Sequence, residues 1–364
     1  MLEQLKEELK TLAGLIDPEH VRKTEELQDK LFAFEPLERV PVAICGSRRE
    51  NYTPFPHDEE FGDRDKMLLN QLVSAHQGAL LKDDRVYVVR ADYGVAMVPS
   101  LFGAEYHVDE TSTWSMGVND TGMIKKIVSG GVPDVTKGLT GLAMETQAYF
   151  TDCFKRYGLD KYVHVAQCDS QSPIDVACMV WGNDIWYAMV DEPGLVHGLL
   201  DLATETIIAF INAQKSIIDF KNHWYYHVGP GVRVVDDSSI CLSPGMYNEF
   251  VRPYNERVIA AVNGNGHIHY CGHLLQHQHE RLHTKGLVSV EIGGENTAES
   301  VPGFTLANIW QEAYEHSIVL AYLSDRLPEA RPGLDRGLFY IPINLYDDNA
   351  GAIGFFNKVR EFWS

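Results

Sequence analysis

The order of extended and helical segments is the feature that most constrains the fold of this chain. Eight short runs rich in β-branched, aromatic and other apolar residues follow one another, and most successive pairs are separated by a stretch with helical spacing of apolar residues. The runs are 40–45, 86–92, 162–171, 232–237, 267–272, 287–293, 318–325 and 338–345. Strands that alternate with helices pair in parallel. Eight of them predict a closed (β/α)8 barrel of the TIM type, with its active site at the carboxyl ends of the strands.

The competing interpretation is an open, doubly wound sheet. Nucleotide-binding sheets of that class carry Gly-x-Gly-x-x-Gly after an early strand or a P-loop, and this sequence has neither. Residues 1–34 have apolar residues at helical spacing, and we expect two N-terminal helices that cap the barrel. Residues 93–160 form a long excursion after the second strand and are a candidate lid. Because no repeat or low-complexity linker interrupts the pattern, we expect one domain over 1–364.

Composition narrows the range of functions. The chain has 364 residues, of which 45% are hydrophobic, so it can bury a large core. Lys and Arg number 31 against 51 Asp and Glu, and the net charge of −20 argues against nucleic acid, which requires a basic surface. Six scattered cysteines without a Cys-x-x-Cys pair are typical of a reducing compartment. With no signal peptide and no apolar run of membrane-span length, we expect a cytoplasmic protein without a membrane partner.

Residues 264–273 carry the first candidate metal ligands. Their sequence, Gly-Asn-Gly-His-Ile-His-Tyr-Cys-Gly-His, predicts a short strand that includes His269 and Cys271 near its end. Alternate residues of a strand project to the same face, so these two side chains lie together. One nitrogen and one sulfur ligand make half of a typical zinc site. A buried histidine beside a cysteine in an ordinary core is the alternative interpretation.

Polar residues also gather at the other predicted strand ends. They are Arg48, Arg49, Asp92, Cys168, Asp169, Gln171, Asp236, Asp237, Glu291, Ser324, Asp325 and Asn344. The strand interiors are expected to be apolar, as in a packed barrel. Polarity therefore falls where the fold predicts catalysis, although strand ends lead into loops, which are polar in any case.

Two further motifs stay open. The helix after the His-x-Cys strand contains His273 and His277, and also His279 and His283, each pair four residues apart and able to bind zinc. We favour a solvated helix face for these pairs, except for His273, which lies nearest the strand end. The aromatic segment His223-Trp-Tyr-Tyr-His227 either lines a substrate or packs the bottom of the barrel.

Four segments resemble the uroporphyrinogen decarboxylase superfamily, which includes zinc- and cobalamin-linked methyltransferases. Residues 39–42 look like its opening strand, 169–182 like its Gln-Gly-Pro segment and the following helix, 235–254 like its acidic strand end and Ser-Pro helix, and 269–272 like its His-x-Cys-Gly motif. The segments occur in the order of the family. The resemblance therefore covers nearly the whole chain and implies the family's barrel.

The true decarboxylases hold an octacarboxylate porphyrinogen with an arginine-rich segment, Met-Arg-Gln-Ala-Gly-Arg-Tyr, after the first strand. Here residues 45–52 read Cys-Gly-Ser-Arg-Arg-Glu-Asn-Tyr, with the arginines out of register. Desolvating eight carboxylates requires a strongly cationic pocket, which a chain of net charge −20 is poorly suited to provide. We therefore reject the porphyrinogen as a substrate.

The methyltransferase branch binds zinc with His-x-Cys and a later cysteine, but no cysteine follows Cys271 here. Candidates for the third ligand are Glu291, Asp237, His227 and His273, unless the metal has been lost. A carboxylate or imidazole ligand would make the site harder. That change shifts the expected chemistry from coenzyme M toward an oxygen or nitrogen methyl donor, or a folate.

The resemblance implies a methyltransferase that moves a methyl group between a small methylated compound or folate and the corrinoid (cobalamin) of a partner protein. Zinc held by His269, Cys271 and Glu291 would act as a Lewis acid. The expected catalytic residues are Asp169, Asp236 and Asp237, and the expected substrate-binding residues are Arg48, Asp92, Gln171, His227 and Asn344. The family also suggests a homodimer.

Two alternatives remain. One is a decarboxylase or lyase of a small acid, with Arg48 and Arg49 anchoring the carboxylate. The other is a non-catalytic barrel that binds a corrinoid or a partner.

Overall fold

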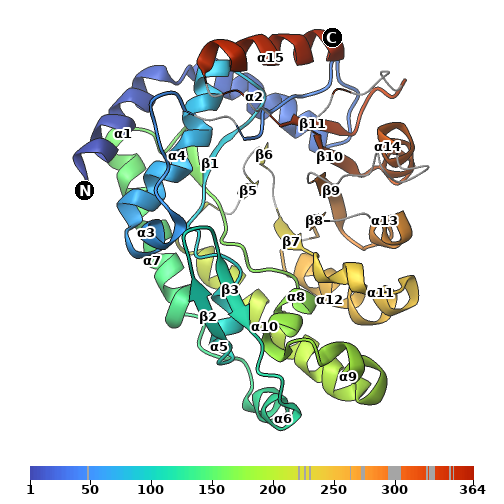
Figure 1. Cartoon of the computed structure of the whole chain (residues 1–364). Helices are drawn as coiled ribbons and strands as arrows, with labels where there is room; N and C mark the ends of the chain where they lie inside the picture. The colour runs from blue at the N-terminus through green and yellow to red at the C-terminus, as the bar shows by residue number, and fades with distance from the viewer. Residues whose placement is uncertain are drawn as a thin grey trace.

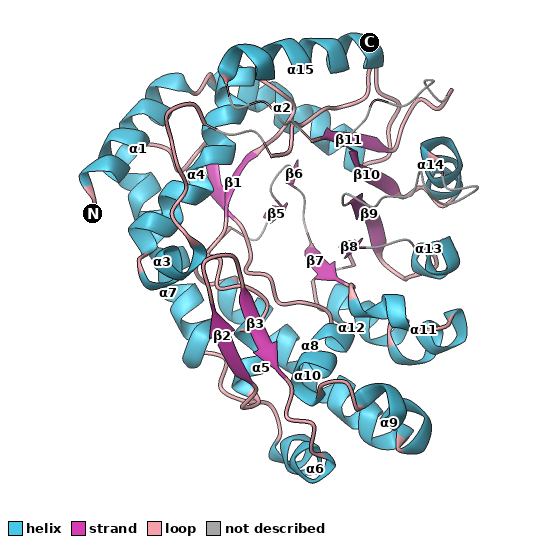
Figure 2. Cartoon of the chain, in the orientation of Figure 1, coloured by secondary structure: helices cyan, strands magenta, loops and turns pink. Residues whose placement is uncertain are grey.

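The computed structural model describes residues 1–46, 49–219, 222–224, 227–228, 231–262, 264–271, 275–293, 305–324, 327, 333–343, 346 and 348–364. Helices and parallel strands alternate along the chain. Figure 1 shows the parallel strands on the inside of the molecule with most helices around them, and Figure 2 shows the same layering by element type.

Parallel pairing occurs in each of the eight predicted runs. Five strands form one sheet, in the order β7 (Val232–Val235), β8 (Gly266–Cys271), β9 (Leu287–Gly293), β10 (Val319–Ser324) and β11 (Leu338–Pro342). Parallel bridges at Val42 and Cys45 join the first run to β11. Strands β1 (Tyr87–Val89) and β4 (Val163–Val165) pair with each other. The predicted α/β class and parallel strands are therefore confirmed.

The strand pairs of the described residues do not close a ring. No ladder joins the first run to β1, or β4 to β7, within the part of the chain that the structure describes. Between the first run and β1, side-chain carboxylates accept hydrogen bonds from strand amides. Asp84 accepts from the Val42 amide (2.9 Å) and Asp83 from the Ile44 amide (2.9 Å). Closure of the barrel stays a prediction.

The register of the large sheet aligns residues that share one face. Val235, His269, Glu291, Ala321 and Phe339 occupy one row across the five strands. The row is polar on β8 and β9 and becomes apolar on β10 and β11, where it joins a buried apolar cluster. The adjacent row continues this pattern from Arg233 through His267 and Ser289 to Val319.

The expectation that strand interiors are apolar is therefore wrong for β7, β8 and β9. Arg233, His267 and Ser289 lie inside these strands and are buried. A charged side chain within a strand needs charged or polar partners on the neighbouring strands, because an unpaired buried charge is costly. The partners of Arg233 form part of the site described below.

The two N-terminal helices are present as α1 (Glu3–Leu15) and α2 (Pro18–Phe32). Asp17 caps the start of α2, and its carboxylate accepts from the amides of Glu19 and His20. Helix α2 lies across the amino ends of the strands: Gln28 donates to the Asp84 carbonyl (2.7 Å), and the ring of Phe32 meets the edge of His267 at 5.4 Å. The expected cap is thus formed by α2, while α1 packs on α4.

The remaining helices either surround the strands or pack on other helices. They are α3 (His57–Gly62), α4 (Arg64–Leu81), α5 (Met97–Leu101), α6 (Thr121–Gly130), α7 (Gly138–Tyr157), α8 (Pro173–Trp181), α9 (Ile185–Asp191), α10 (Pro193–Gln214), α11 (Pro244–Phe250), α12 (Arg252–Ala260), α13 (Leu275–Leu282), α14 (Leu306–Glu315), α15 (Asn349–Trp363) and the 3-10 turn η1 (Ser238–Cys241).

The excursion 93–160 is largely regular structure. It contains an antiparallel hairpin of β2 (Glu105–Val108) and β3 (Thr113–Met116), and α7 is the helix that connects β1 to β4. After the hairpin, the Val118 amide donates to the Val180 carbonyl of α8 (2.9 Å). Gly117 and Gly182 pass so closely that a Cβ on Gly117 would lie 2.4 Å from the Gly182 Cα. This end of the excursion is anchored to α8, and its role as a lid stays a prediction.

Among the described helices, α10 alone has the length and apolarity of a membrane span. Of its apolar window, 56% is buried inside the structure, and the helix packs against α8, α9 and α12. Burial in the protein core explains the apolar composition of α10, so the helix is weak evidence for a membrane span.

Candidate active site

A chain of charged side chains links the ends and interiors of five strands; we call it the charged chain. Its successive nitrogen-to-oxygen distances are 2.6 Å for Asp92–Arg90, 3.2 Å for Arg90–Asp169, 3.7 Å for Asp169–Arg233, 3.4 Å for Arg233–Glu291, 2.6 Å for Glu291–His269 and 3.9 Å for His269–Asp237. Opposite charges alternate along most of it, which is the arrangement that buried ions require. Only the last member is well exposed: the side chain of Asp237 is 42% accessible.

The structure brings together five residues that the sequence placed at separate strand ends: Asp92, Asp169, Asp237, His269 and Glu291. Sequence reasoning missed the two arginines between them. Arg90 follows β1 and Arg233 lies within β7, and both are buried. The available signal was the isolated arginine in Val-Arg-Val-Val, since a lone charge inside an apolar strand needs a partner on a neighbouring strand.

His269 is held in one orientation. Its Nδ1 lies 2.6 Å from Glu291 Oε1, and that carboxylate accepts the Nδ1 proton. In the neutral ring, Nε2 is therefore the nitrogen that presents a lone pair. Nε2 lies 3.9 Å from Asp237 Oδ1, on the more exposed side of the ring. The ring can thus serve as a ligand or base through Nε2.

Asp169 organises the middle of the charged chain. Its Oδ1 accepts from the side chain of Gln171 (2.9 Å) and from the Gln171 amide (3.2 Å), while Oδ2 lies near Arg90 and Arg233. Gln171 adopts a left-handed φ of 60° in this turn. A carboxylate with four donors around it is suited to anchoring the two arginines.

Asp92 ends the charged chain on the side of β1. Burial opposes its ionisation, but the charge and hydrogen bond of Arg90 outweigh burial and hold the Asp92 pKa below its usual value. Asp92 also accepts from the Gly94 amide (3.1 Å). It is therefore an ionised carboxylate at neutral pH.

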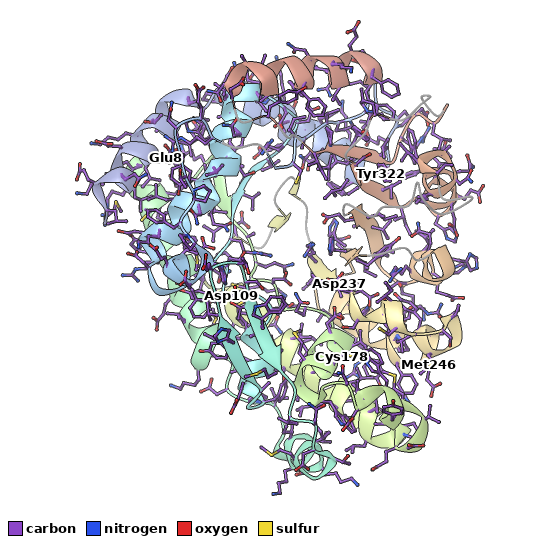
Figure 3. All side chains as sticks on the ribbon, in the orientation of Figure 1. Glu8, Asp109, Cys178, Asp237, Met246 and Tyr322 are labelled. Atoms are coloured by element: carbon purple, nitrogen blue, oxygen red, sulfur yellow. The ribbon has the colours of Figure 1, made fainter. Side chains whose placement is uncertain are left out.

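Asp236 and Asp237 point in different directions. Asp236 is fully buried, accepts from the Tyr247 hydroxyl (3.0 Å) and lies 3.5 Å from Arg281 Nε. Burial raises the pKa of Asp236 to about 6. The structure therefore places Asp236 among the helices behind β7 and leaves Asp237 alone at the candidate site, beside β7 in Figure 3.

Asp175 is a second residue that sequence reasoning missed. It sits in the first turn of α8 and accepts from the amides of Asp237 (3.0 Å) and Ser238 (2.7 Å). Burial, together with the charges of Asp237 and Asp236, raises the pKa of Asp175 to about 8. Asp175 thus fixes the turn that carries Asp237. The Ser172-Pro-Ile-Asp175 helix start marked the residue in the sequence, but nothing there indicated its partner.

Several predicted residues cannot be placed. Arg48 and Asn344 lie outside the described residues, as do Asp325, His273 and the side chains of His227 and Cys271. The register pairs Cys271 with Gly293, two positions beyond the His269–Glu291 pair, so Cys271 belongs to the same face of the sheet. The backbone of β6 (His227–Val228) contacts α2.

Arg49 has a structural partner. Its guanidinium lies 2.5 Å from Glu8 of α1, and the Glu8 carboxylate also contacts His76 at 2.9 Å. Glu8 is almost completely buried. This pair ties the start of the chain to the segment after the first strand, and it directs Arg49 away from the charged chain.

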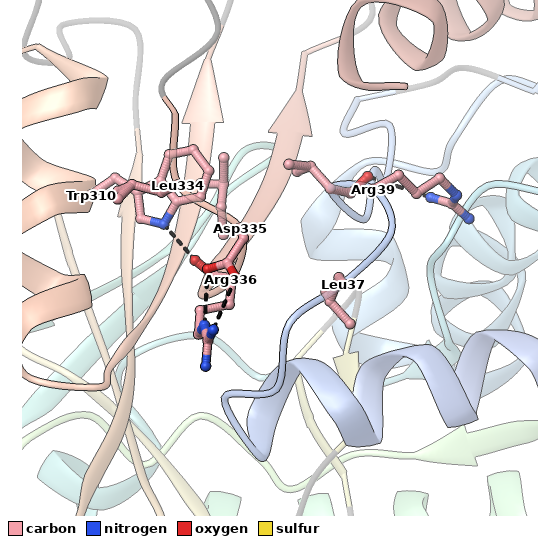
Figure 4. A pocket seen from close by; sticks show the side chains of 8 residues that line it. Leu37, Arg39, Trp310, Leu334, Asp335 and Arg336 are labelled. Carbon is pink, nitrogen blue, oxygen red and sulfur yellow. Dashed lines mark hydrogen bonds and ion pairs between the residues drawn. The ribbon is translucent and has the colours of Figure 1, made fainter.

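A small pocket of about 20 Å³ lies at the opposite end of the strands (Figure 4). It is lined by Leu37, Arg39, Trp310 and Arg336, among others, and Trp310 donates to the Arg336 carbonyl (2.8 Å). The pocket adjoins the start of β11, whereas barrel enzymes bind substrates at the carboxyl ends. It has room for about one water molecule, so it is no substrate site.

Residues 168–292 match the sequence model of the uroporphyrinogen decarboxylase (URO-D) family. The match spans 125 of the 364 residues, about a third of the chain. The match includes the charged chain from Asp169 to Glu291, with His269 and Asp237 between them. The resemblance is therefore confirmed for the three segments within this range, 169–182, 235–254 and 269–272.

Among solved structures, the fold is similar to that of a methyltransferase from Methanosarcina mazei, with a TM-score of 0.64. The likeness covers 92% of this chain and 97% of the other at 14% sequence identity, and at that identity it shows the fold alone. No curated protein matches the sequence significantly. The chain thus has a URO-D-like α/β fold of the kind found in a methyltransferase.

Proposed function

We propose that this chain, with its URO-D-like fold, is a methyltransferase that moves a methyl group between a small methylated compound or folate and the corrinoid of a partner protein. The orientation of His269 is the observation that carries the proposal. Glu291 holds the ring by Nδ1, so that Nε2 faces Asp237 on the strand face that also carries Cys271. The similar fold of a methyltransferase supports it.

The donor set fits a zinc ion. Two ligands of one tetrahedral zinc lie about 3.4 Å apart, given bond lengths near 2.1 Å. His269 Nε2 and Asp237 Oδ1 are separated by 3.9 Å, so a small rotation of the exposed Asp237 would bring both to one ion. The described residues contain no three side chains already arranged to hold a metal. Cys271, whose side chain lies outside the described part, would supply the thiolate.

Asp237 fits the role of carboxylate ligand better than Glu291, the residue expected from the sequence. Glu291 Oε1 contacts both His269 Nδ1 (2.6 Å) and Arg233 (3.4 Å), which places it behind the histidine. A carboxylate in that position fixes the tautomer of a ligand histidine and increases its basicity. Bound zinc would supply Lewis acidity to the heteroatom that loses or gains the methyl group.

The charges of the site disfavour the alternative of a small carboxylic acid substrate. Both interior arginines already face carboxylates: Arg90 lies between Asp92 and Asp169, and Arg233 between Asp169 and Glu291. An incoming carboxylate would have to displace these partners. Arg49, expected to anchor such a substrate, is engaged with Glu8.

The test combines metal analysis with an optical assay of methyl-cobalamin. We expect the purified protein to hold about one zinc per chain at His269, Cys271 and Asp237, in addition to any metal bound elsewhere. Cys271→Ala and Asp237→Ala should lose it, whereas Cys153→Ala, which alters a cysteine of α7, should keep it. The zinc-loaded protein should change the cobalamin spectrum with at least one methyl donor or acceptor of a panel that includes methoxyl compounds, methylamines and folates. No spectral change with any of them would refute the proposal.

A further inference from the structure

Three histidines and a glutamate of α13, α14 and the residue after each of these helices lie close together on the surface of the protein. We call His279, His283, His316 and Glu312 the histidine cluster. The ring centres of His279 and His283 are 4.5 Å apart, and those of His283 and His316 are 4.8 Å apart. His279 Nδ1 lies 3.5 Å from Glu312 Oε1. The three histidines are exposed and Glu312 is partly exposed.

The spacing of the four residues is that of two facing ligand pairs. His279 and His283 are four residues apart on α13, and Glu312 and His316 are four residues apart at the end of α14. Residues at that spacing share one side of a helix. Helices α13 and α14 follow the adjacent parallel strands β8 and β9, which brings the two pairs together. The sequence showed only the first pair, and its interpretation as a solvated face rested on the lack of a third ligand.

The chemistry of the histidine cluster suits a borderline divalent cation. Imidazole nitrogens bind zinc, nickel and copper(II), and four ligands complete a tetrahedral zinc site. The Nδ1 of His283 donates to the His279 carbonyl (2.7 Å), which leaves Nε2 as the nitrogen with a lone pair. One ligand atom of the set is thereby selected before any metal binds.

The cluster is not yet arranged as a finished site. Among the residues that the structure describes, no three ligating side chains converge at metal-binding distance. Ligand atoms about 3.4 Å apart are needed around a tetrahedral ion. Ring centres 4.5 and 4.8 Å apart can meet that spacing by rotation about χ1 and χ2, and exposed side chains change rotamer readily.

We propose that the histidine cluster is a second metal site, for Zn²⁺ or Ni²⁺, which is separate from the site at His269. An ion held there would join the helix after β8 to the helix after β9. These are the strands that carry His269 and Glu291, so metal binding would stabilise the part of the fold that supports the candidate active site.

The experiment uses the full chain with Cys271→Ala, so that metal at the strand ends does not confuse the result. Metal-free protein is titrated with Co²⁺ by visible absorption and with Zn²⁺ by calorimetry, and its unfolding temperature is measured with and without Zn²⁺. We expect one saturable site per chain and a rise in the unfolding temperature. Adding His283→Ala should weaken binding at least tenfold and abolish that rise. Adding His107→Ala, a matched change at an exposed histidine of β2, should alter neither.

A second variant, Glu312→Gln, keeps the shape of the side chain and should weaken Zn²⁺ binding less than His283→Ala does. Circular dichroism establishes that each variant is folded, which is expected for substitutions at exposed or partly exposed positions. The proposal is overturned if the Cys271→Ala protein has no saturable site, or if His283→Ala binds as tightly as its parent.

Discussion

Replacing Arg233 with methionine removes one buried charge from the charged chain while keeping a long, flexible side chain. The guanidinium lies 3.7 Å from Asp169 Oδ2 and 3.4 Å from Glu291 Oε1, and the residue is 6% exposed. The substitution leaves two buried carboxylates without the cation between them. We expect a large loss of stability and a looser hold on Glu291 and His269.

The structure gives the size of the effect. At an effective dielectric constant of about 20, unit charges at these separations of 3.4 and 3.7 Å attract by about 5 and about 4 kcal/mol. Desolvation of the guanidinium cancels part of this attraction. Removing one partner of a buried pair typically costs about 3–5 kcal/mol, so we expect Arg233→Met to lower the free energy of unfolding by about 4 kcal/mol at pH 7.5.

The loss of stability caused by Arg233→Met should depend on pH. When the cation is gone, a buried carboxylate can relieve its desolvation by taking up a proton, which happens more readily as the pH falls. The folded variant then binds more protons than the unfolded chain, so its stability falls as the pH rises. The destabilisation at pH 5.5 should be smaller than that at pH 7.5 by about 1–2 kcal/mol.

The assay is guanidinium-induced unfolding of the wild type, Arg233→Met and Arg233→Lys at both pH values, with equal m-values required for comparison. Lysine keeps the charge and should recover part of the loss. A double-mutant cycle with Glu291→Gln measures the coupling of the pair directly. A cost below about 1 kcal/mol, equal at both pH values, would refute the view of Arg233 as the ion that holds the charged chain together.

The remaining predictions concern three other positions. Glu291→Gln should weaken zinc binding by roughly 10- to 100-fold, because the acceptor behind His269 loses its charge; metal competition measures this, and unchanged affinity would contradict the role of Glu291. Burial raises the pKa of Asp175 from its usual value of 3.8 to about 8. Between these two pH values the folded protein keeps a proton on Asp175 that the unfolded chain has lost. This contribution to stability therefore falls as the pH rises to about 8. The cost of Asp175→Asn should therefore fall by about 1.4 kcal/mol per pH unit between pH 5 and 7 in chemical unfolding; a cost that does not change with pH would mean that the carboxyl group is ionised. Gly117→Ala should lower the unfolding temperature, because its Cβ would lie 2.4 Å from the Gly182 backbone, whereas the control Gly130→Ala has open space around its Cβ and should not.

The sequence determined the class of the fold and indicated the family that part of the chain matches. Strand and helix periodicities are local, so the eight runs could be located without knowledge of their partners, and each of them contains parallel-paired residues. The placement of His269 and Cys271 on one strand face follows from alternation along the strand. The order of four short segments was enough to indicate the uroporphyrinogen decarboxylase family.

Only the tertiary structure decided which of the polar residues work together. Asp236 and Asp237 are neighbours in the sequence, yet one contacts Tyr247 and the other faces His269. Arg233 forms ion pairs with Asp169 and Glu291, which lie 64 and 58 residues away along the chain. The histidine cluster likewise joins His283 to His316, from the next helix. Such contacts depend on strand register and helix order, and a pattern read along one segment contains no information about either.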